Sequence, residues 1–231
     1  MPGPIWRLIR WPLFASMLLL GIFFVEQLFN MEFTTLGVHP RSLKGLVGLL
    51  FSPLLHGSLT HLLSNVSTLL LLGIGLQYFY PKVLRKAFVY LYFLPSLGVW
   101  FFGRGLSRGG IEVYHIGASG LLYAFAALLF FSGVFRKDRE SLAISMAVGL
   151  LYHGLLYSLF PTEPGVSWEA HLSGFIVGTV VAFAYRNTAD AYSLGRSRAG
   201  AEELQEIGDG KQGYQPLENK SFKYHYRSKQ E

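Results

Sequence analysis

Residues 59–80 of the chain read LTHLLSNVSTLLLLGIGLQYFY, a run of 22 residues without lysine, arginine, aspartate or glutamate. A helix needs about 20 mostly apolar residues to cross the roughly 30 Å hydrocarbon core of a bilayer, so this run predicts a membrane-spanning helix. Runs of similar character occupy residues 87–103, 116–135, 141–160 and 170–185, and a further run at residues 11–29 is interrupted only by Glu26. The sequence therefore predicts an all-α polytopic membrane protein with a bundle of six transmembrane helices.

The distribution of charge supports this fold class. Of the 231 residues, 51% are hydrophobic and only 15% are charged, whereas a soluble domain carries about 25% charged residues. Of the 34 charged residues, 15 fall within the last 46. We therefore expect an N-terminal segment (1–10), a membrane domain (11–185) and a polar, disordered tail (186–231). The chain has no cysteine, which excludes disulfides and thiolate chemistry.

The basic residues predict how the helices are oriented. With a cytoplasmic N-terminus, 16 lysines and arginines fall on the cytoplasmic side and four on the other side. Positive charge is enriched in cytoplasmic loops, so both termini are expected in the cytoplasm. The first helix is expected to be a retained anchor, and a bacterial inner membrane is the expected location. Residues 45–55 are apolar but too short to span, which predicts a re-entrant element between helices 1 and 2.

Three polar motifs lie inside the predicted spans, where polar side chains are unfavourable and call for a partner or a function. They are HGSLTHLLSN at the second span, HIGASGLLYA at the fourth and AHLSGFIVG at the sixth. In the predicted topology, these three spans begin at the outer leaflet, so the motifs lie at one depth. Their polar residues are His56, His61, Asn65, Ser119, Tyr123 and His171, and their glycines are Gly117, Gly120, Gly174 and Gly178.

These side chains favour nucleophilic catalysis. Serine needs a base to take its proton, and imidazole does this near neutral pH, so Ser119 and His171 are the candidate nucleophile and general base. The side chains of His61 and Asn65 and the Ser119 amide are the candidate donors to an oxyanion. No aspartate lies in the spans, so the pair is a dyad, and Tyr123 is expected to stack on the imidazole. No metal or cofactor is expected.

Glycines accompany both members of the dyad. Gly117 and Gly120 flank Ser119, and Gly174 and Gly178 form a GxxxG pair one and two turns after His171. Small residues at this spacing allow two helices to approach closely within a membrane. The fourth and sixth helices are therefore expected to pack together.

Taken together, the three motifs resemble the rhomboid family of intramembrane serine proteases, and the resemblance covers residues 11–185. It implies a six-helix bundle with a membrane-embedded loop between helices 1 and 2, and the same roles for Ser119, His171, His61, Asn65 and Tyr123. It also implies that the substrates are single-span membrane proteins. Many members carry a Trp-Arg pair in that loop, whereas here an arginine follows proline at 40–41.

Other functions are consistent with parts of the pattern. A catalytically inactive rhomboid-like protein would bind transmembrane segments without cutting them, but such proteins lose the serine or the histidine. A metallohydrolase would need carboxylate ligands at membrane depth, and a transporter would need broken helices at mid-bilayer. Of the remaining histidines, His56 is expected to bond the loop backbone, His153 to be structural and His115 to be solvated.

Overall fold

The computed structural model describes residues 5–107, 109–137, 139–161 and 165–188. The chain divides into two units, Met1–Tyr192 and Ser193–Glu231, and every described residue belongs to the first. The predicted polar tail therefore lies outside the described residues, except for residues 186–188.

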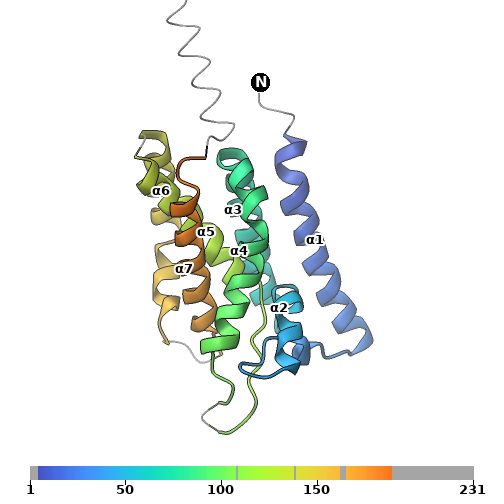
Figure 1. The fold of residues 1–231 in the computed structure, drawn as a ribbon. Helices are drawn as coiled ribbons and strands as arrows, with labels where there is room; N and C mark the ends of the chain where they lie inside the picture. The colour runs from blue at the N-terminus through green and yellow to red at the C-terminus, as the bar shows by residue number, and fades with distance from the viewer. Residues whose placement is uncertain (1–4, 108, 138, 162–164, 189–231) are drawn as a thin grey trace, which may run out of the picture. The chain divides into compact units, whose positions relative to one another are not determined.

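The regular structure of the described residues is helical (Figure 1). The long helices are α1 (Trp6–Phe29), α3 (Leu59–Phe79), α4 (Pro81–Phe102), α5 (Ser119–Arg136), α6 (Arg139–Leu151) and α7 (Trp168–Ala184). Shorter elements are η1 (Thr34–Leu36), η2 (Lys44–Val47), α2 (Gly48–Phe51), η3 (Ser52–Leu54) and η4 (His153–Leu159). The described residues contain no β-strand, so the all-α prediction is confirmed.

Three helices, α1, α3 and α5, are long and apolar enough to cross a membrane. The helices α6 and α7 are shorter, with apolar stretches at Ser141–Leu151 and Trp168–Ala184. Large apolar side chains on α1, such as Trp11, Phe14 and Met17, are exposed, which would be unfavourable in water and is favourable against lipid tails. The protein is therefore a polytopic helical membrane protein.

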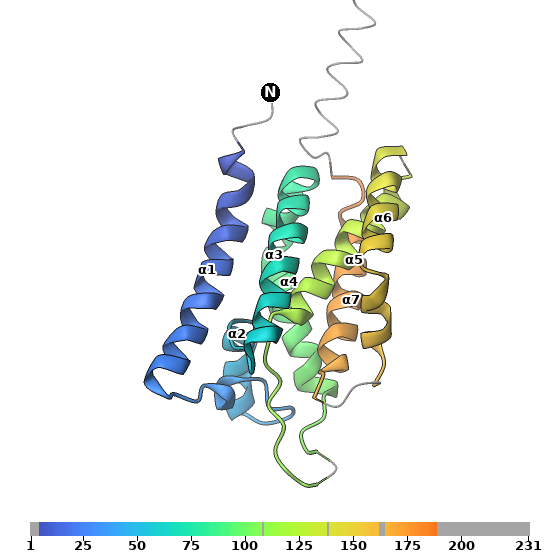
Figure 2. The ribbon, with the colours of Figure 1, turned by 180° about the vertical axis from the view of Figure 1, so that it is seen from behind.

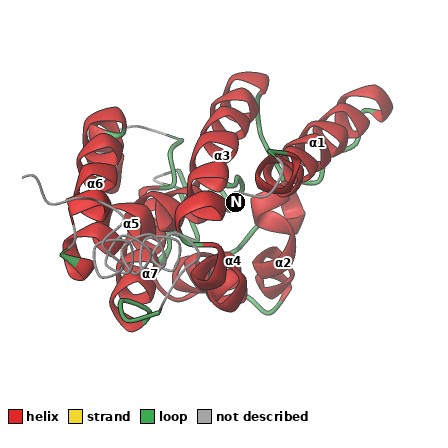
Figure 3. Ribbon diagram, turned by 90° about the horizontal axis from the view of Figure 1, so that it is seen from above, coloured by secondary structure: helices red, strands yellow, loops and turns green. Residues whose placement is uncertain are grey.

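Successive long helices alternate in direction, so α3, α5 and α7 all run the same way (Figures 1 and 2). They begin toward the end of the bundle where α2 and the loop joining α4 to α5 also lie. Viewed down the bundle, α5 lies beside α6 and α7, and α1 lies beside α3 (Figure 3). The three polar motifs are therefore brought toward one end of the bundle.

Helix α5 is the central helix of this arrangement. Every residue from Gly120 to Leu129 is buried, as expected for a helix that is apolar on all sides. Its closest approach is to α7, where added side chains at Gly174 and Gly178 would overlap the carbonyl oxygens of Gly120 and Ala124. The GxxxG pair thus allows backbone-to-backbone contact between α5 and α7.

Helices α1 and α4 begin five and six residues before the predicted runs 11–29 and 87–103, whereas two other runs are divided or shortened in the structure. The run 141–160 is divided, because α6 ends at Leu151 and η4 follows. At this point Nδ1 of His153 lies 2.9 Å from the Leu150 carbonyl oxygen, and such side-chain bonds compete with the helical pattern. The run 116–135 becomes helical only at Ser119, because Gly117 has a φ of 115° that no helix residue adopts.

Candidate active site

The side chains of Ser119 and His171 meet where α5 and α7 are closest. Ser119 is the first residue of α5, and His171 lies one turn into α7. The Ser119 Oγ atom lies 2.9 Å from Nε2 of His171, a hydrogen-bond distance suited to proton transfer between a nucleophile and its base. Of the two residues, His171 is buried and Ser119 is half-buried.

The second ring nitrogen of His171 determines which tautomer is present. Nδ1 lies 3.0 Å from the carbonyl oxygen of Ser158 in η4, and a carbonyl can only accept a hydrogen bond. Nδ1 therefore carries the hydrogen, and Nε2 presents its lone pair to the Ser119 hydroxyl. A backbone carbonyl thus does the orienting that an aspartate performs in a catalytic triad. Sequence reasoning could not find this carbonyl, because any residue type supplies one.

Tyr123 lies against the same imidazole. Its ring is nearly parallel to that of His171, with centroids 4.2 Å apart and an interplanar angle of 6°. Tyr123 is one turn after Ser119 on α5 and is buried. The predicted stacking contact is therefore present, and it restricts rotation of the imidazole while the Ser158 carbonyl sets its tautomer.

The candidate oxyanion donors lie beside the turn that precedes α5. A Cβ atom at Gly117 would lie 2.6 Å from Cε1 of His61 and 3.7 Å from Nδ2 of Asn65. Glycine is needed at this position both for its positive φ and for the room that the His61 ring occupies. His61 and Asn65 are one turn apart on α3, so both reach the same side of the site.

His56 takes part in this cluster through Asn65. Its Nε2 atom lies 2.8 Å from Nδ2 of Asn65, and both residues are buried. The amide nitrogen is the donor, which leaves its second hydrogen available to another acceptor. The His56 and His61 rings are also in contact, with centroids 5.1 Å apart. The expectation that His56 bonds the loop backbone misses this contact, in which His56 orients the Asn65 amide.

The dyad and the candidate oxyanion donors line one cavity of about 1550 Å³. Its lining includes His61, Asn65, Ser119, Tyr123 and His171, together with hydroxyl side chains from α3. The three motifs, far apart in sequence, thus face a single space that has both apolar and polar walls. Among the described residues, no three His, Asp or Glu side chains are grouped so as to hold a metal ion.

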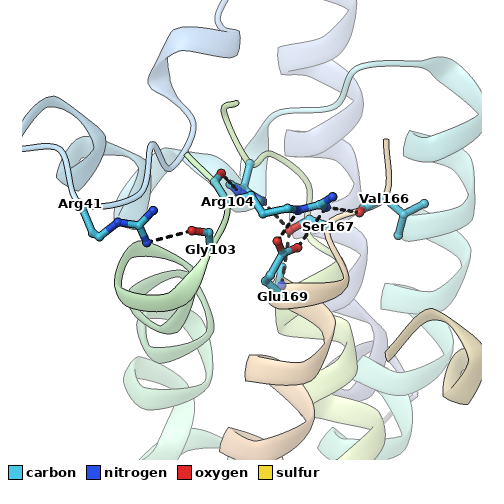
Figure 4. A network of polar contacts seen from close by, with 8 residues as sticks. Arg41, Gly103, Arg104, Val166, Ser167 and Glu169 are labelled. Carbon is cyan, nitrogen blue, oxygen red and sulfur yellow. Dashed lines mark hydrogen bonds and ion pairs between the residues drawn. The ribbon is translucent and has the colours of Figure 1, made fainter. Parts of the chain in front are cut away.

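A second polar cluster borders the same cavity, and the sequence motifs did not predict it. It consists of Arg104, His115, Ser167 and Glu169, and Figure 4 shows its ion pair and backbone contacts. The expectation that His115 is solvated is wrong: the residue is buried, and its backbone pairs with Val38. Burial lowers the pKa of His115, and the Glu169 carboxylate and the Arg104 carbonyl partly offset that shift.

Comparison with known proteins shows which family the chain belongs to. The family model of the Rhomboid domain matches residues 44–188. An uncharacterised protein from Mycobacterium tuberculosis is 34% identical over 163 residues, which cover 69% of this chain and 67% of the relative. One from Mycobacterium bovis matches to the same extent. Another, from Mycobacterium leprae, is 32% identical over 165 residues, covering 69% of this chain and 64% of the relative. The chain belongs to the rhomboid family.

Proposed function

We propose that this protein is an intramembrane serine endopeptidase that cleaves transmembrane segments with a Ser119–His171 dyad. The observation that carries the proposal is the 2.9 Å contact between Ser119 Oγ and His171 Nε2, combined with the Nδ1 bond to the Ser158 carbonyl. Together these contacts supply a hydroxyl, a free lone pair facing it and a fixed tautomer. Membership of the rhomboid family supports the same reaction class.

The proposed membrane arrangement uses α1, α3, α4, α5, α6 and α7 as six spans within residues 11–185. The apolar helical stretch Lys44–Leu54 is too short to span, so it is proposed as a membrane-embedded loop between the first two spans. The excess of basic residues on the side of the termini favours an orientation with both ends in the cytoplasm. The site would then lie in the outer half of the bilayer, in a bacterial inner membrane, and residues 186–231 would form a cytoplasmic tail.

The chemistry follows from the positions of these groups. Ser119 Oγ attacks the scissile carbonyl carbon while Nε2 of His171 takes its proton. The carbonyl oxygen becomes an oxyanion, which the Ser119 amide, His61 and the free hydrogen of Asn65 stabilise. His171 then gives its proton to the leaving amine, which breaks the peptide bond and leaves an acyl-enzyme. Water that enters the cavity hydrolyses this ester, with His171 again acting as the base.

The depth of the site limits the substrates. The carbonyl groups of a regular helix are occupied by hydrogen bonds, so a transmembrane segment must unwind locally before Ser119 can attack it. Glycine or proline in the outer part of a helix makes that unwinding easier. The proposed substrates are therefore single-span membrane proteins with such residues near the outer surface.

An activity probe that needs no natural substrate tests the dyad. A fluorophosphonate reacts only with an activated serine, so it should label the wild-type protein and neither Ser119→Ala nor His171→Ala. His153→Ala is the control, since this exposed histidine lies outside the cavity and its variant should label normally. Labelling of the Ser119→Ala variant would mean that another serine reacts. A folded wild type that binds substrate but is neither labelled nor active would instead indicate the inactive, binding-only function.

A further inference from the structure

The loop that joins α4 to α5 is tied to the first turn of α7 by Arg104 (Figure 4). Its Nε atom lies 2.6 Å from Oε1 of Glu169, and its Nη2 atom lies 3.3 Å from Oε2 of the same carboxylate. Nη2 also donates to the Val166 carbonyl at 3.2 Å. The guanidinium thus holds both oxygens of one carboxylate and the backbone that leads into α7, the paired geometry in which arginine binds most specifically.

A second set of hydrogen bonds, made by His115, also joins the loop between α4 and α5 to the start of α7. Nε2 of His115 lies 2.9 Å from the Arg104 carbonyl oxygen, so Nε2 must be the donor. Nδ1 of His115 then accepts from the hydroxyl of Ser167 at 2.6 Å. Ser167 precedes α7 and its Oγ atom accepts from the Ala170 amide, so this chain of bonds ends on the helix cap itself.

The environment of Glu169 makes this attachment specific. Its side chain is only 5% exposed, whereas that of Arg104 is 51% exposed. Among the described residues, Arg104 is the one that forms a salt bridge to this carboxylate. A buried charge that loses its partner is strongly unfavourable. The first turn of α7 therefore has one favourable position, the one in which Glu169 reaches Arg104.

That position also determines where the base lies. Glu169 and His171 are two residues apart, so they project to roughly opposite sides of α7. The glycine contacts of α7 with α5 fix the distance between the two helices. The hydrogen bonds from Arg104 to Glu169 hold the opposite side of the first turn of α7. We propose that Arg104 and Glu169 are a positioning pair that sets the register of His171 against Ser119. This inference rests on the proposed dyad chemistry and adds a residue pair outside it.

Variants that remove the Arg104–Glu169 ion pair test whether the pair positions His171 or only stabilises the fold. One variant leaves the Glu169 charge buried without its partner, and another removes that charge as well. Arg104→Gln is too short to reach Glu169 and should lower kcat by about 10- to 100-fold at nearly constant KM, as for a catalytic group displaced by up to about 1 Å. Arg104→Lys keeps a cation that can reach the carboxylate and should recover part of the rate. The double variant Arg104→Gln/Glu169→Gln has no unpaired buried charge, so its thermal stability should return toward that of the wild type while kcat stays low.

The control is Lys44→Gln, which removes an exposed cation from another loop and should leave kcat and thermal stability unchanged. Recovery of full kcat together with stability in the double variant would overturn the positioning role. So would an Arg104→Gln variant with wild-type kcat. An inactive, unlabelled wild type would instead contradict the proposed function, so the two failures are distinguishable.

Discussion

At the scale of single residues, the site depends on hydrogen bonds whose direction is fixed by chemistry. Ser158 supplies a carbonyl that can only accept, so His171 must present its lone pair to Ser119. In the same way, the Asn65 amide donates to His56 and keeps one hydrogen for the cavity. Replacing single donors and acceptors therefore tests separate parts of the mechanism.

Asn65→Ala removes one proposed oxyanion donor without touching the dyad. It should slow cleavage by up to about 10²–10³-fold, the range observed when one such donor is lost. His61→Ala should be at least as damaging, because its ring also fills the space beside Gly117. Single-turnover rates on one substrate measure both effects. An unchanged rate in Asn65→Ala would leave this residue as a packing group that bonds His56.

His115 predicts a pH dependence of folding stability. Burial lowers its pKa from the ordinary value of 6.5, so the unfolded chain binds the proton more tightly than the folded protein does. Stability should therefore fall as the pH drops through about 6.5, and be unaffected well above it. Thermal unfolding in detergent, between about pH 7.5 and pH 5, should show a larger loss for the wild type than for His115→Gln. Equal losses would mean that His115 is not buried as described.

At the scale of elements, the contact between α5 and α7 positions the dyad. The two helices approach so closely that Gly174 has no room for a side chain against the Gly120 carbonyl. Helices α3, α5 and α7 also run in one direction (Figure 2), which places their polar motifs toward one end of the bundle.

Gly174→Ala should push α7 away from α5 and separate His171 from Ser119. Overpacking of this kind destabilises by about 1–3 kcal/mol, and the rate of cleavage should fall by at least about 10-fold. Gly21→Ala is the matched control, because the same methyl group on α1 has nothing within 4 Å. Thermal unfolding and cleavage rates should change little in this control. Equal behaviour of the two variants would contradict the close packing of α5 on α7.

The sequence predicted the features that depend on local pattern. Apolar runs with little or no charge locate the helices, and the three motifs locate Ser119, His171 and their neighbours. Features that depend on distant contacts were not predictable. His115 is buried because its backbone pairs with Val38, and Arg104 meets Glu169 across 65 positions of sequence. Neither partner is marked by a motif, so the second polar cluster emerged only from the fold.

At the scale of the whole molecule, the proposed topology makes a direct prediction. A reporter fused after Glu231 should lie in the cytoplasm, because 16 of the 20 basic residues fall on that side in the proposed arrangement. A reporter inserted at Gly109, in the loop between α4 and α5, should lie on the opposite side. Alkaline phosphatase, active only outside the cytoplasm, distinguishes the two positions. Activity of the fusion at Glu231 would reverse the orientation and the depth assigned to the site.

The central claim is that this protein cuts a transmembrane segment with Ser119. The most direct measurement is mass spectrometry of the cleavage products. Purified protein is reconstituted into liposomes with a single-span reporter whose outer half carries glycine and proline. The proposal predicts one cut within the outer part of the span by the wild type and an intact reporter with Ser119→Ala. Cleavage that persists in the Ser119→Ala variant, or a reporter that binds the wild type and remains uncut, would contradict the claim.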